Sequence, residues 1–596
     1  MKACFIMISF TAGYCMQSNP YFVSINSLPD NYSVHETDIC LFLPLCDFLK
    51  IMEAIIEGFV TEDRARFPNG PPKKFSYGTA GFRERANLLE CVLFRASVIA
   101  GLRSRAARGS IGIVITASHN PVEDNGVKFV DTRGEMLIPE WESVASEIAN
   151  ATNSDLKEVI MSTVNKYSLN DINYNPVIQI ARDTRPSSDG LLALLKDGLQ
   201  LLGVRYTDHG LLTTPQLHFI VKSHNSQCSY GQPTPLGYYQ KLSKAFRSLM
   251  SQVVSDSKPV MKLDAANGVG AGRVIELLEH IGDIMNIEVY NDGTNGELNY
   301  MCGADFVKAS QVAPNGVPIV PGGCYVSFDG DADRIVFWYC SKDGGKFVLL
   351  DGDRIASLMA MFIKDHLLTL SLKLNMSVIQ TAYANGSSTT YIQETLDIPV
   401  TFTETGVKYL QRKAQEFDIG IFFEANGHGT VLYSDTAVER IKAFVHNEKL
   451  SDDVRSSGKA LLDLIDLTNQ TTGDSISDML IVQVILSHKK WSFDDWANLY
   501  TDLPNEQIKV KVKDRQVIKT ADEERKCVKP DGLQDLIDKL VNTVSKGRSF
   551  VRPSGTEDIV RVYAEAETKE EAHSLGIAVA QSVFELAGGI GTKPVL

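Results

Sequence analysis

A short polar loop follows the apolar run IVIT (residues 113–116) and places Ser118 and His119 side by side. The β-branched run predicts a buried strand that ends at this loop. A serine at the end of such a strand suggests a nucleophile, but the Gly-x-Ser-x-Gly pattern of serine hydrolases is absent. The hydroxyl therefore requires an explanation other than hydrolase chemistry.

A second loop, in SFDGDADRIVF (residues 327–337), carries Asp329, Asp331 and Asp333 at alternate positions after another apolar run. Three carboxylates this close repel one another unless a cation joins them. Hard oxygen ligands suit Mg²⁺ or Ca²⁺, but the glycine and glutamate of an EF-hand loop are missing at its sixth and twelfth positions. The loop predicts a divalent metal site, and the alternative is a solvated acidic turn.

A third loop, in FVRPSGTEDIVRVY, has the properties of an anion-binding site. Arg552 and Arg561 flank Ser554, Gly555 and Thr556. Small residues let backbone N–H groups approach an anion, and hydroxyl and guanidinium groups complete its coordination. The loop favours phosphate binding, and the alternative is a capped helix start with surface arginines.

Two further glycine-rich loops are less specific. FFEANGHGTV presents Glu424, Asn426 and His428, a mixture of acceptors and donors that suits sugar hydroxyls. FSYGTAGFRER offers Arg83 beside a tight turn. Each loop taken alone is equally compatible with a turn that carries polar side chains.

Two other polar stretches favour a structural interpretation. Asp183 and Arg185 in ARDTRPSS are expected to fix a loop by an ion pair. LDAANGVGAG (residues 263–272) has glycines like a dinucleotide-binding loop, but their spacing is wrong, so we expect a structural turn.

The 596 residues carry a net charge of −14, which argues against a nucleic-acid or anionic-membrane partner. The ten cysteines are scattered without a Cys-x-x-Cys pair, which favours a reducing, cytoplasmic compartment over a disulfide framework or a zinc site. No run is long and apolar enough for a transmembrane helix.

The first sixty residues are expected to form an extension that is partly disordered or helical. Residues 3–10 resemble a weak signal peptide, but their apolar run is short and only one lysine precedes it. Residues 41–60 are mostly apolar with interspersed charges, which predicts a helix packed on the body of the protein.

Strand-like and amphipathic helical stretches alternate along most of the chain, which predicts α/β domains with mainly parallel sheets. Ser118, Asp329 and Glu424 each follow an apolar strand, which suggests one unit used three times. A charged helical connector is expected at about 436–485, before a separate α+β domain in which IVRVYAEAE forms a half-exposed antiparallel strand. The expected boundaries are an extension 1–60, domains 61–225, 226–342 and 343–455, a connector 456–485 and a last domain 486–596.

The ordered set of loops is specific where single loops are not. TASHNP, DGDADR, a glycine-rich glutamate loop and RPSGTE occur in this order, and the chain resembles the α-D-phosphohexomutase superfamily. YGTAGFR, EANGHGT, LLTTPQLH, CGADFVK and TAYANGSST resemble its members that act on N-acetylglucosamine phosphates. The resemblance covers roughly residues 70–595. It implies four domains around a central cleft, three related α/β domains and a different C-terminal one, each contributing one active-site loop.

The resemblance implies that Ser118 carries a phosphoryl group and that Mg²⁺ bridges this phosphate and the three aspartates. It suggests Arg83 and Arg334 for steadying the transferred group, and His119 and Lys128 for proton handling or charge stabilisation. The implied reaction interconverts N-acetylglucosamine 6-phosphate and 1-phosphate through a sugar 1,6-bisphosphate, and feeds UDP-N-acetylglucosamine synthesis. The substrate residues implied are Gly406, Lys408, Glu424, Asn426 and His428 for the sugar, and Arg552, Ser554, Gly555, Thr556 and Arg561 for the distal phosphate.

Two other functions fit parts of the pattern. A phosphatase or another phosphohexomutase would use the same loops, and a phosphatase would release free phosphate without forming sugar 1-phosphate. A non-catalytic sugar-phosphate binder would be expected to lack Ser118 or one of the aspartates, and none is missing. The mutase interpretation is therefore preferred.

Overall fold

The computed structural model describes residues 5–6, 43–79, 81–169, 171, 174–253, 258–343, 345–555 and 557–595. Most of the signal-like run, and Thr556 of the phosphate loop, lie outside these ranges. Within them, β1 (Phe5–Ile6) pairs with β2 (Leu43–Pro44), and α1 (Leu45–Arg66) packs on the body as expected. No helix in the described part of the chain has the length and apolar character to cross a membrane.

The first unit is built on a five-stranded sheet of order β3-β5-β4-β6-β7. Its central strand β4 is buried at every position, as the β-branched run predicts. The strands are β3 (Phe82–Arg85), β4 (Ile111–Ile115), β5 (Asp124–Val130), β6 (Val177–Arg182) and β7 (Arg205–Leu211). The helices are α2 (Glu90–Ala107), α3 (Pro139–Asn150), α4 (Leu156–Lys166), α5 (Ser188–Leu201) and α6 (Thr214–Asn225).

The second unit has a five-stranded sheet of order β12-β11-β10-β8-β9. Its strands are β8 (Val260–Asp264), β9 (Asn286–Tyr290), β10 (Tyr325–Phe328), β11 (Ile335–Cys340) and β12 (Phe347–Leu350). Its helices are α7 (Pro235–Met250), α8 (Gly270–Ile281) and α9 (Ala304–Ser310).

The third unit has a four-stranded sheet of order β14-β13-β15-β16. Its strands are β13 (Met376–Gln380), β14 (Val400–Phe402), β15 (Ile419–Phe423) and β16 (Gly429–Tyr433). The helices around it are α10 (Gly352–Thr369), α11 (Gly386–Thr390), α12 (Val407–Ala414), α13 (Asp435–Val445), α14 (Asp452–Leu467), α15 (Ser475–Lys489) and α16 (Phe493–Ala497).

The three sheets share one strand pattern. A central strand, β4, β10 or β15, pairs in parallel with the strand on one side (β6, β8 or β13) and antiparallel with the next strand of the chain on the other side (β5, β11 or β16). The Ser118, Asp329 and Glu424 loops each join this central strand to its antiparallel neighbour. The expectation of a unit used three times is therefore confirmed at the level of topology. The sheets are mixed: two of four strand pairings are parallel in each of the first two sheets, and two of three in the third.

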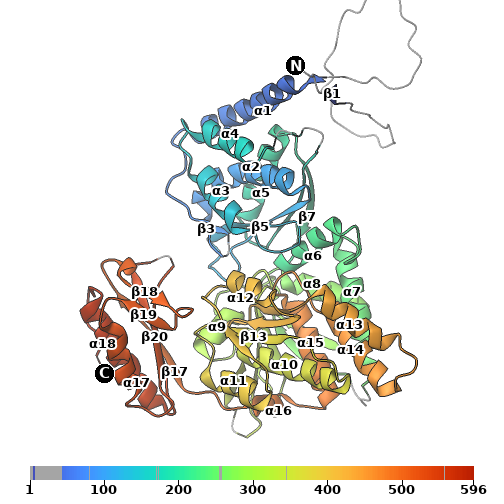
Figure 1. Ribbon diagram of the computed structural model, residues 1–596, viewed down its shortest axis with the longest axis vertical. Helices are drawn as coiled ribbons and strands as arrows, with labels where there is room; N and C mark the ends of the chain where they lie inside the picture. Colours follow the sequence, from blue (N-terminus) through green and yellow to red (C-terminus); the bar gives the residue numbers. More distant parts are fainter. Residues whose placement is uncertain are drawn as a thin grey trace, which may run out of the picture.

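The helices expected as a charged connector are part of the protein core. Residues along nearly the whole of α15 are buried, and α14 packs against α7 and α10. One continuous hydrophobic cluster joins these helices to the second and third sheets, and a separate cluster fills the first unit. Figure 1 shows the first unit, from blue to green, above the common body of the second and third.

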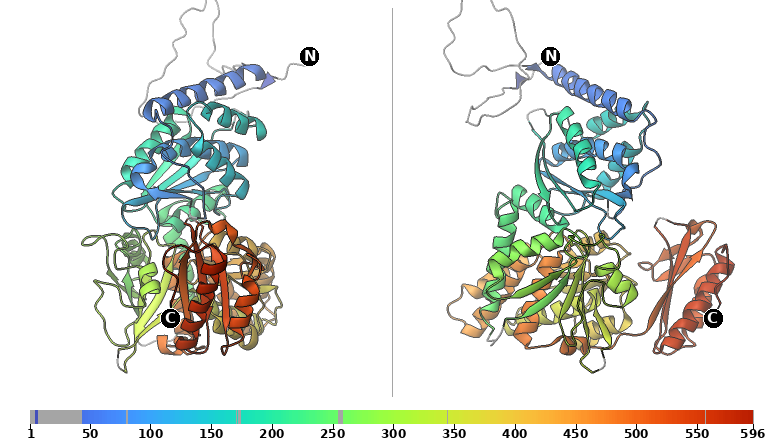
Figure 2. Two further views of the ribbon diagram at one scale, coloured as in Figure 1. Left: turned by 90° about the vertical axis from the view of Figure 1, so that its left-hand side faces the viewer. Right: turned by 180° about the vertical axis from the view of Figure 1, so that it is seen from behind.

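The fourth unit is an antiparallel sheet of order β17-β21-β20 with two helices and a small hairpin. Its elements are β17 (Asn505–Lys511), β18 (Lys519–Ala521), β19 (Lys526–Lys529), α17 (Leu533–Val541), β20 (Arg548–Pro553), β21 (Ile559–Glu565) and α18 (Lys569–Leu586). Figures 1 and 2 show it standing beside the body formed by the second and third units.

Strand β21 is antiparallel as expected, but it is buried at six of its seven positions and not half-exposed. Helix α18 packs on the fourth sheet, and Ala382 and Tyr383 of the third unit pack against Phe550 and Tyr563. Arg548 donates to the carbonyl oxygens of Ala382 and Ala384 at 2.7 and 2.6 Å. Sequence alternation alone could not show that a neighbouring unit covers this sheet.

Candidate active site

Ser118 lies at the end of β4 in a strained and buried position. Its φ is 52°, in the left-handed region that is costly for a residue other than glycine, and it is 1% exposed. Its Oγ lies 2.5 Å from Oδ2 of Asp329 and 3.5 Å from Oδ1 of Asp333. The loops of the first and second units thus meet at this hydroxyl.

The loop that follows β6 holds the serine loop in place by hydrogen bonds to its backbone. Arg185 donates to the carbonyl oxygens of Ser118 and Asn120, both at 2.9 Å, and also to those of Pro121 and Asp124. Its Nε lies 3.0 Å from Asp183, and both side chains are fully buried. The expected structural ion pair is confirmed, and it fixes the path of residues 118–124.

The three aspartates form a buried group, and one ammonium lies against two of them. Lys128 Nζ lies 2.8 Å from Oδ2 of both Asp331 and Asp333. Burial, together with the charges of Asp333 and Asp331, raises the pKa of Asp329 well above its usual range. The Oδ1 atom of Asp331 is buried and has no hydrogen-bond partner among the described residues. Crowded acids with an unpartnered oxygen fit a divalent cation.

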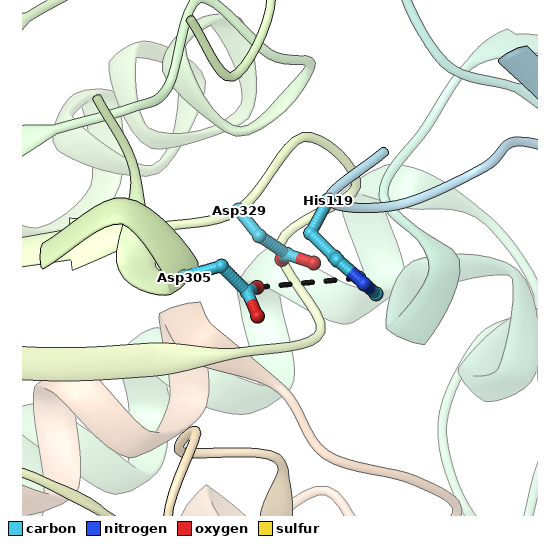
Figure 3. Close-up of side chains that lie close together, drawn as sticks. All are labelled: His119, Asp305 and Asp329. Atoms are coloured by element: carbon cyan, nitrogen blue, oxygen red, sulfur yellow. Dashed lines mark ion pairs between the residues drawn. The ribbon is translucent and has the colours of Figure 1, made fainter. Parts of the chain in front are cut away.

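A second group, His119, Asp305 and Asp329, also brings three metal-ligating atoms together (Figure 3). Both carboxylate oxygens of Asp305, however, accept from Arg334 at 2.8 and 3.0 Å. His119 Nδ1 lies 4.0 Å from Oδ2 of Asp305. Burial and the nearby charges of Arg334 and Arg83 hold the pKa of His119 well below its usual range. A guanidinium already neutralises this group, so it is a weaker metal site than the triplet.

A cavity of about 270 Å³ opens above Ser118 and is lined by loops of the first three units. Arg83 reaches it from β3, and its guanidinium donates to the side chain of Asn120 at 2.8 Å. The cavity brings together most residues singled out in the sequence, namely Arg83, Ser118, Lys128, Asp333, Arg334, Gly406, Glu424, Asn426 and His428.

The glutamate loop faces this cavity from the third unit. Gly427 has φ 84°, and a Cβ there would lie 1.6 Å from the carbonyl oxygen of Ile335, so only glycine allows this turn to pack on the metal-loop strand. His428 Nδ1 lies 3.3 Å from Oδ1 of Asp333, which links the third loop to the second. Lys408 does not line the cavity, and instead pairs at 2.9 Å with Glu142, which does.

The arginine loop of the fourth unit is not at the cavity. Arg552 and Arg561 lie opposite each other on β20 and β21, and Ser554 is 3% exposed. None of the described residues of this unit is among those that line the cavity. The structure therefore brings three of the four predicted loops together and leaves the fourth beside them.

Several residues that shape the site were not assigned a role from the sequence. Thr214 donates to Oδ2 of Asp331 at 2.6 Å, and Asn299 donates to the carbonyl oxygen of Ser118 at 2.8 Å. Thr214 and Asp305 belong to the motifs LLTTPQLH and CGADFVK, which indicated the family resemblance but not the role of either residue. The predicted structural turn at 263–272 packs on the metal loop, because a Cβ on Gly268 would lie 2.4 Å from the carbonyl oxygen of Gly330.

Sequence profiles of known families match all four units. Phosphoacetylglucosamine mutase AMG1 domain II matches residues 233–336, and its domain III matches residues 351–491. The phosphoglucomutase/phosphomannomutase domain I matches residues 101–156 and 146–231, and the C-terminal domain matches residues 508–582. The fold and the serine, aspartate and glutamate loops thus define an α-D-phosphohexomutase.

Comparison of nearly the whole chain with individual proteins identifies one family within this class. The phosphoacetylglucosamine mutases of Mus musculus and Homo sapiens are both 50% identical, covering 87% and 88% of this chain and 95% and 96% of their own. A structure of the Aspergillus fumigatus N-acetylphosphoglucosamine mutase with GlcNAc-6P and magnesium is 42% identical with a TM-score of 0.84, covering 90% of this chain and 99% of that one. The chain belongs to the phosphoacetylglucosamine mutase family.

Proposed function

We propose that the protein interconverts N-acetylglucosamine 6-phosphate and N-acetylglucosamine 1-phosphate by way of a phosphorylated Ser118. The observation that carries this function is the Ser118 hydroxyl, held 2.5 Å from Asp329 at the floor of a cavity that three units line. It agrees with family membership and with relatives solved in substrate and product complexes, each 44% identical with a TM-score of 0.84.

In the proposed reaction the bond between phosphorus and Ser118 Oγ breaks as a bond to a sugar oxygen forms. The sugar hydroxyl gives up a proton and Ser118 Oγ takes one up as its phosphoryl group leaves, so the products are a sugar 1,6-bisphosphate and the free serine hydroxyl. After the intermediate turns over, its other phosphoryl group returns to Ser118, and the opposite monophosphate leaves. Structures of the Aspergillus fumigatus relative with glucose 1,6-bisphosphate, and with GlcNAc-6P and magnesium, support this sequence of ligands.

The residues around Ser118 supply charge for this transfer. Asp329, Asp331 and Asp333, with Ser118, would hold Mg²⁺, which when bound neutralises charge on the transferred phosphate. Arg83, Arg334 and Lys128 surround the same point and would stabilise the phosphoryl oxygens. His119 is the nearest imidazole, with Nδ1 3.4 Å from Ser118 Oγ, and is assigned to proton handling. Burial and the charges of Arg334 and Arg83 lower its pKa, so the imidazole is neutral and only a weak base.

The sugar and the second phosphate are assigned to the remaining loops. Glu424, Asn426, His428 and Gly406 line the cavity and would contact the sugar, while Lys408 acts through Glu142. Arg552, Ser554, Gly555, Thr556 and Arg561 are proposed to bind the distal phosphate. The four units are proposed to be the domains bounded as expected from the sequence, with 456–485 integrated in the core. The charge and the cysteine pattern support a cytoplasmic enzyme without a nucleic-acid partner.

Intact-mass spectrometry tests the phosphate carrier directly. The wild-type protein and Ser118→Ala are incubated with a sugar 1,6-bisphosphate and Mg²⁺. We expect one added phosphate on the wild type only, and interconversion of the two sugar monophosphates by the wild type only. Equal labelling of both proteins would place the carrier elsewhere, and free phosphate without sugar 1-phosphate would indicate a phosphatase.

A further inference from the structure

Arg552 of the distal-phosphate loop already has an anionic partner in this structure. Its Nε lies 3.1 Å from Oε1 of Glu524, and the two side chains are only 18% and 15% exposed. A carboxylate and a phosphate present the same kind of acceptor oxygens to a guanidinium. Glu524 therefore pairs with the same guanidinium that the proposed function assigns to the distal phosphate of the substrate.

The other oxygen of Glu524 reaches a different unit. Its Oε2 accepts from the backbone N–H of Thr405 at 3.0 Å and from Thr405 Oγ1 at 2.5 Å. Thr405 precedes Gly406, which lines the cavity. One carboxylate thus connects the phosphate arginine of the fourth unit to the sugar loop of the third.

The turn that presents Glu524 is strained and supported from outside. Asp522, Glu523 and Glu524, between β18 and β19, have φ values of 54°, 51° and 69°. Consecutive left-handed residues other than glycine persist only where the surroundings hold them. Here Arg525 stacks over the ring of Phe402 in the third unit, with its Cζ atom 4.3 Å from the ring centroid. The contact holds the turn against the third unit.

We propose that Glu524 is a positioning residue that holds Arg552 in the substrate-free enzyme and yields it to the distal phosphate. The inference rests on the proposed function, since that function places a phosphate at Arg552. A phosphate ester carries about −1.5 to −2 charges, more than a carboxylate, so it displaces Glu524 from the arginine. Because it must displace a competitor, it binds more weakly than it would to an unpaired Arg552.

The same exchange aids the turnover of the bisphosphate. The intermediate can reverse its orientation only after its distal phosphate leaves Arg552. Glu524, still held near the arginine by Thr405, takes the guanidinium back and offsets the charge that this departure exposes. Without the carboxylate, the distal phosphate leaves more slowly, so binding tightens while the catalytic rate falls.

Glu524→Gln removes the charge and keeps an oxygen for Thr405. The matched control is Glu523→Gln in the same turn, because Glu523 is 42% exposed and lies 3.6 Å from Arg525. Binding of N-acetylglucosamine 6-phosphate is measured by calorimetry in the Ser118→Ala background, with inorganic phosphate as a second probe. We expect about fivefold tighter binding for Glu524→Gln, as for loss of a part-buried ion pair, and no change for Glu523→Gln.

Steady-state kinetics with Ser118 intact complete the test. We expect kcat and KM to fall together in Glu524→Gln, by about fivefold each, and Glu524→Ala to change both in the same direction. Unchanged or weaker binding overturns the proposal, and so does a loss of kcat without tighter binding, which is the result of a structural role. Because the calorimetry needs no turnover, failure of the mutase reaction in the wild type is recognised separately.

Discussion

At the scale of residues, the environment of Ser118 favours the proposed role of phosphate carrier over that of a hydrolase nucleophile. Buried carboxylates surround its Oγ, which disfavours an alkoxide, and Lys128 and Arg334 stand beside these carboxylates. A cationic rim around an acidic floor suits a group that arrives with several negative charges together with a metal ion. The chemistry is set by the charges around the hydroxyl.

Lys128 is the cation that joins Asp331 to Asp333, so its removal should affect activity more than any exposed lysine. We expect Lys128→Met to lower kcat about 10²- to 10³-fold, the magnitude typical of losing one preorganised charge near a reacting group. The measurement is the initial rate of sugar 1-phosphate formation at saturating Mg²⁺, with circular dichroism to confirm folding. A rate within a few-fold of the wild type would show that the lysine has no part in the transfer.

His218 predicts how stability depends on pH. It is 2% exposed, it donates from Nδ1 to the carbonyl oxygen of Gly134, and burial lowers its pKa to about 4. As the pH falls, His218 is therefore protonated near pH 6.5 in the unfolded chain but only near pH 4 in the folded protein. The neutral His218 side chain therefore makes its full contribution to the free energy of unfolding above pH 6.5. This contribution, up to about 3 kcal/mol, is lost as the pH falls to about 4.

Urea unfolding of the wild type and His218→Gln, at neutral pH and at about pH 4.5, measures this contribution. Glutamine does not titrate, so the difference in unfolding free energy between the two proteins should change sign or shrink as the pH falls. A difference that is independent of pH would show that His218 is not held neutral by its burial.

At the scale of elements, each active-site loop joins the same two strands of a repeated sheet. The Ser118, Asp329 and Glu424 loops emerge from the ends of β4, β10 and β15, and turn back into β5, β11 and β16. Hairpins fix both ends of each loop within a few residues, so the position of its side chains is set by the sheet. The second unit meets the first at Ser118 and the third at His428.

Arg185 is the element-scale support whose loss should be most costly. Arg185→Ala leaves Asp183 buried without its partner and removes donors from four carbonyl groups of the serine loop, so we expect a loss of about 3–5 kcal/mol. The control is Arg182→Ala, since Arg182 pairs with Asp189, which is 79% exposed, and should cost less than about 1 kcal/mol. Thermal unfolding measures both, and equal small losses would contradict the role given to Arg185.

Sequence reasoning succeeded where a motif and its strand lie together in the chain. Ser118, the aspartate triplet and the Glu424 loop are each readable because an apolar run precedes a short polar loop. It did not find Asn299, whose contact with Ser118 is made across units and 181 residues. The burial of α15 and β21 also escaped it, because the covering surfaces come from other units. Local pattern predicts the elements, and long-range packing decides which of their faces are exposed.

At the scale of the whole molecule, three units build the cavity and the fourth stands outside it. The fourth unit contacts the third through Arg548, through the turn that carries Glu524 and Arg525, and through a small apolar cluster at Phe550. In addition, Asn385 donates to the carbonyl oxygen of Leu503 at 2.9 Å. Apart from the small cluster at Phe550, these contacts are mostly polar. A connection of this kind permits rotation more readily than the continuous apolar core that joins the second and third units.

If Arg552 and Arg561 bind the distal phosphate, the fourth unit must move toward the cavity when the sugar bisphosphate is bound, which would also exclude water from the transferred group. We expect the radius of gyration, measured by small-angle X-ray scattering, to decrease when sugar 1,6-bisphosphate and Mg²⁺ are added to Ser118→Ala. Adding Arg552→Ala to that variant should abolish the decrease. In the otherwise wild-type enzyme, Arg552→Ala should raise KM about 10- to 100-fold, the cost of one charge-assisted phosphate contact. An unchanged radius in Ser118→Ala with the ligand bound would mean that the fourth unit does not close, and the distal phosphate would then need another binding site.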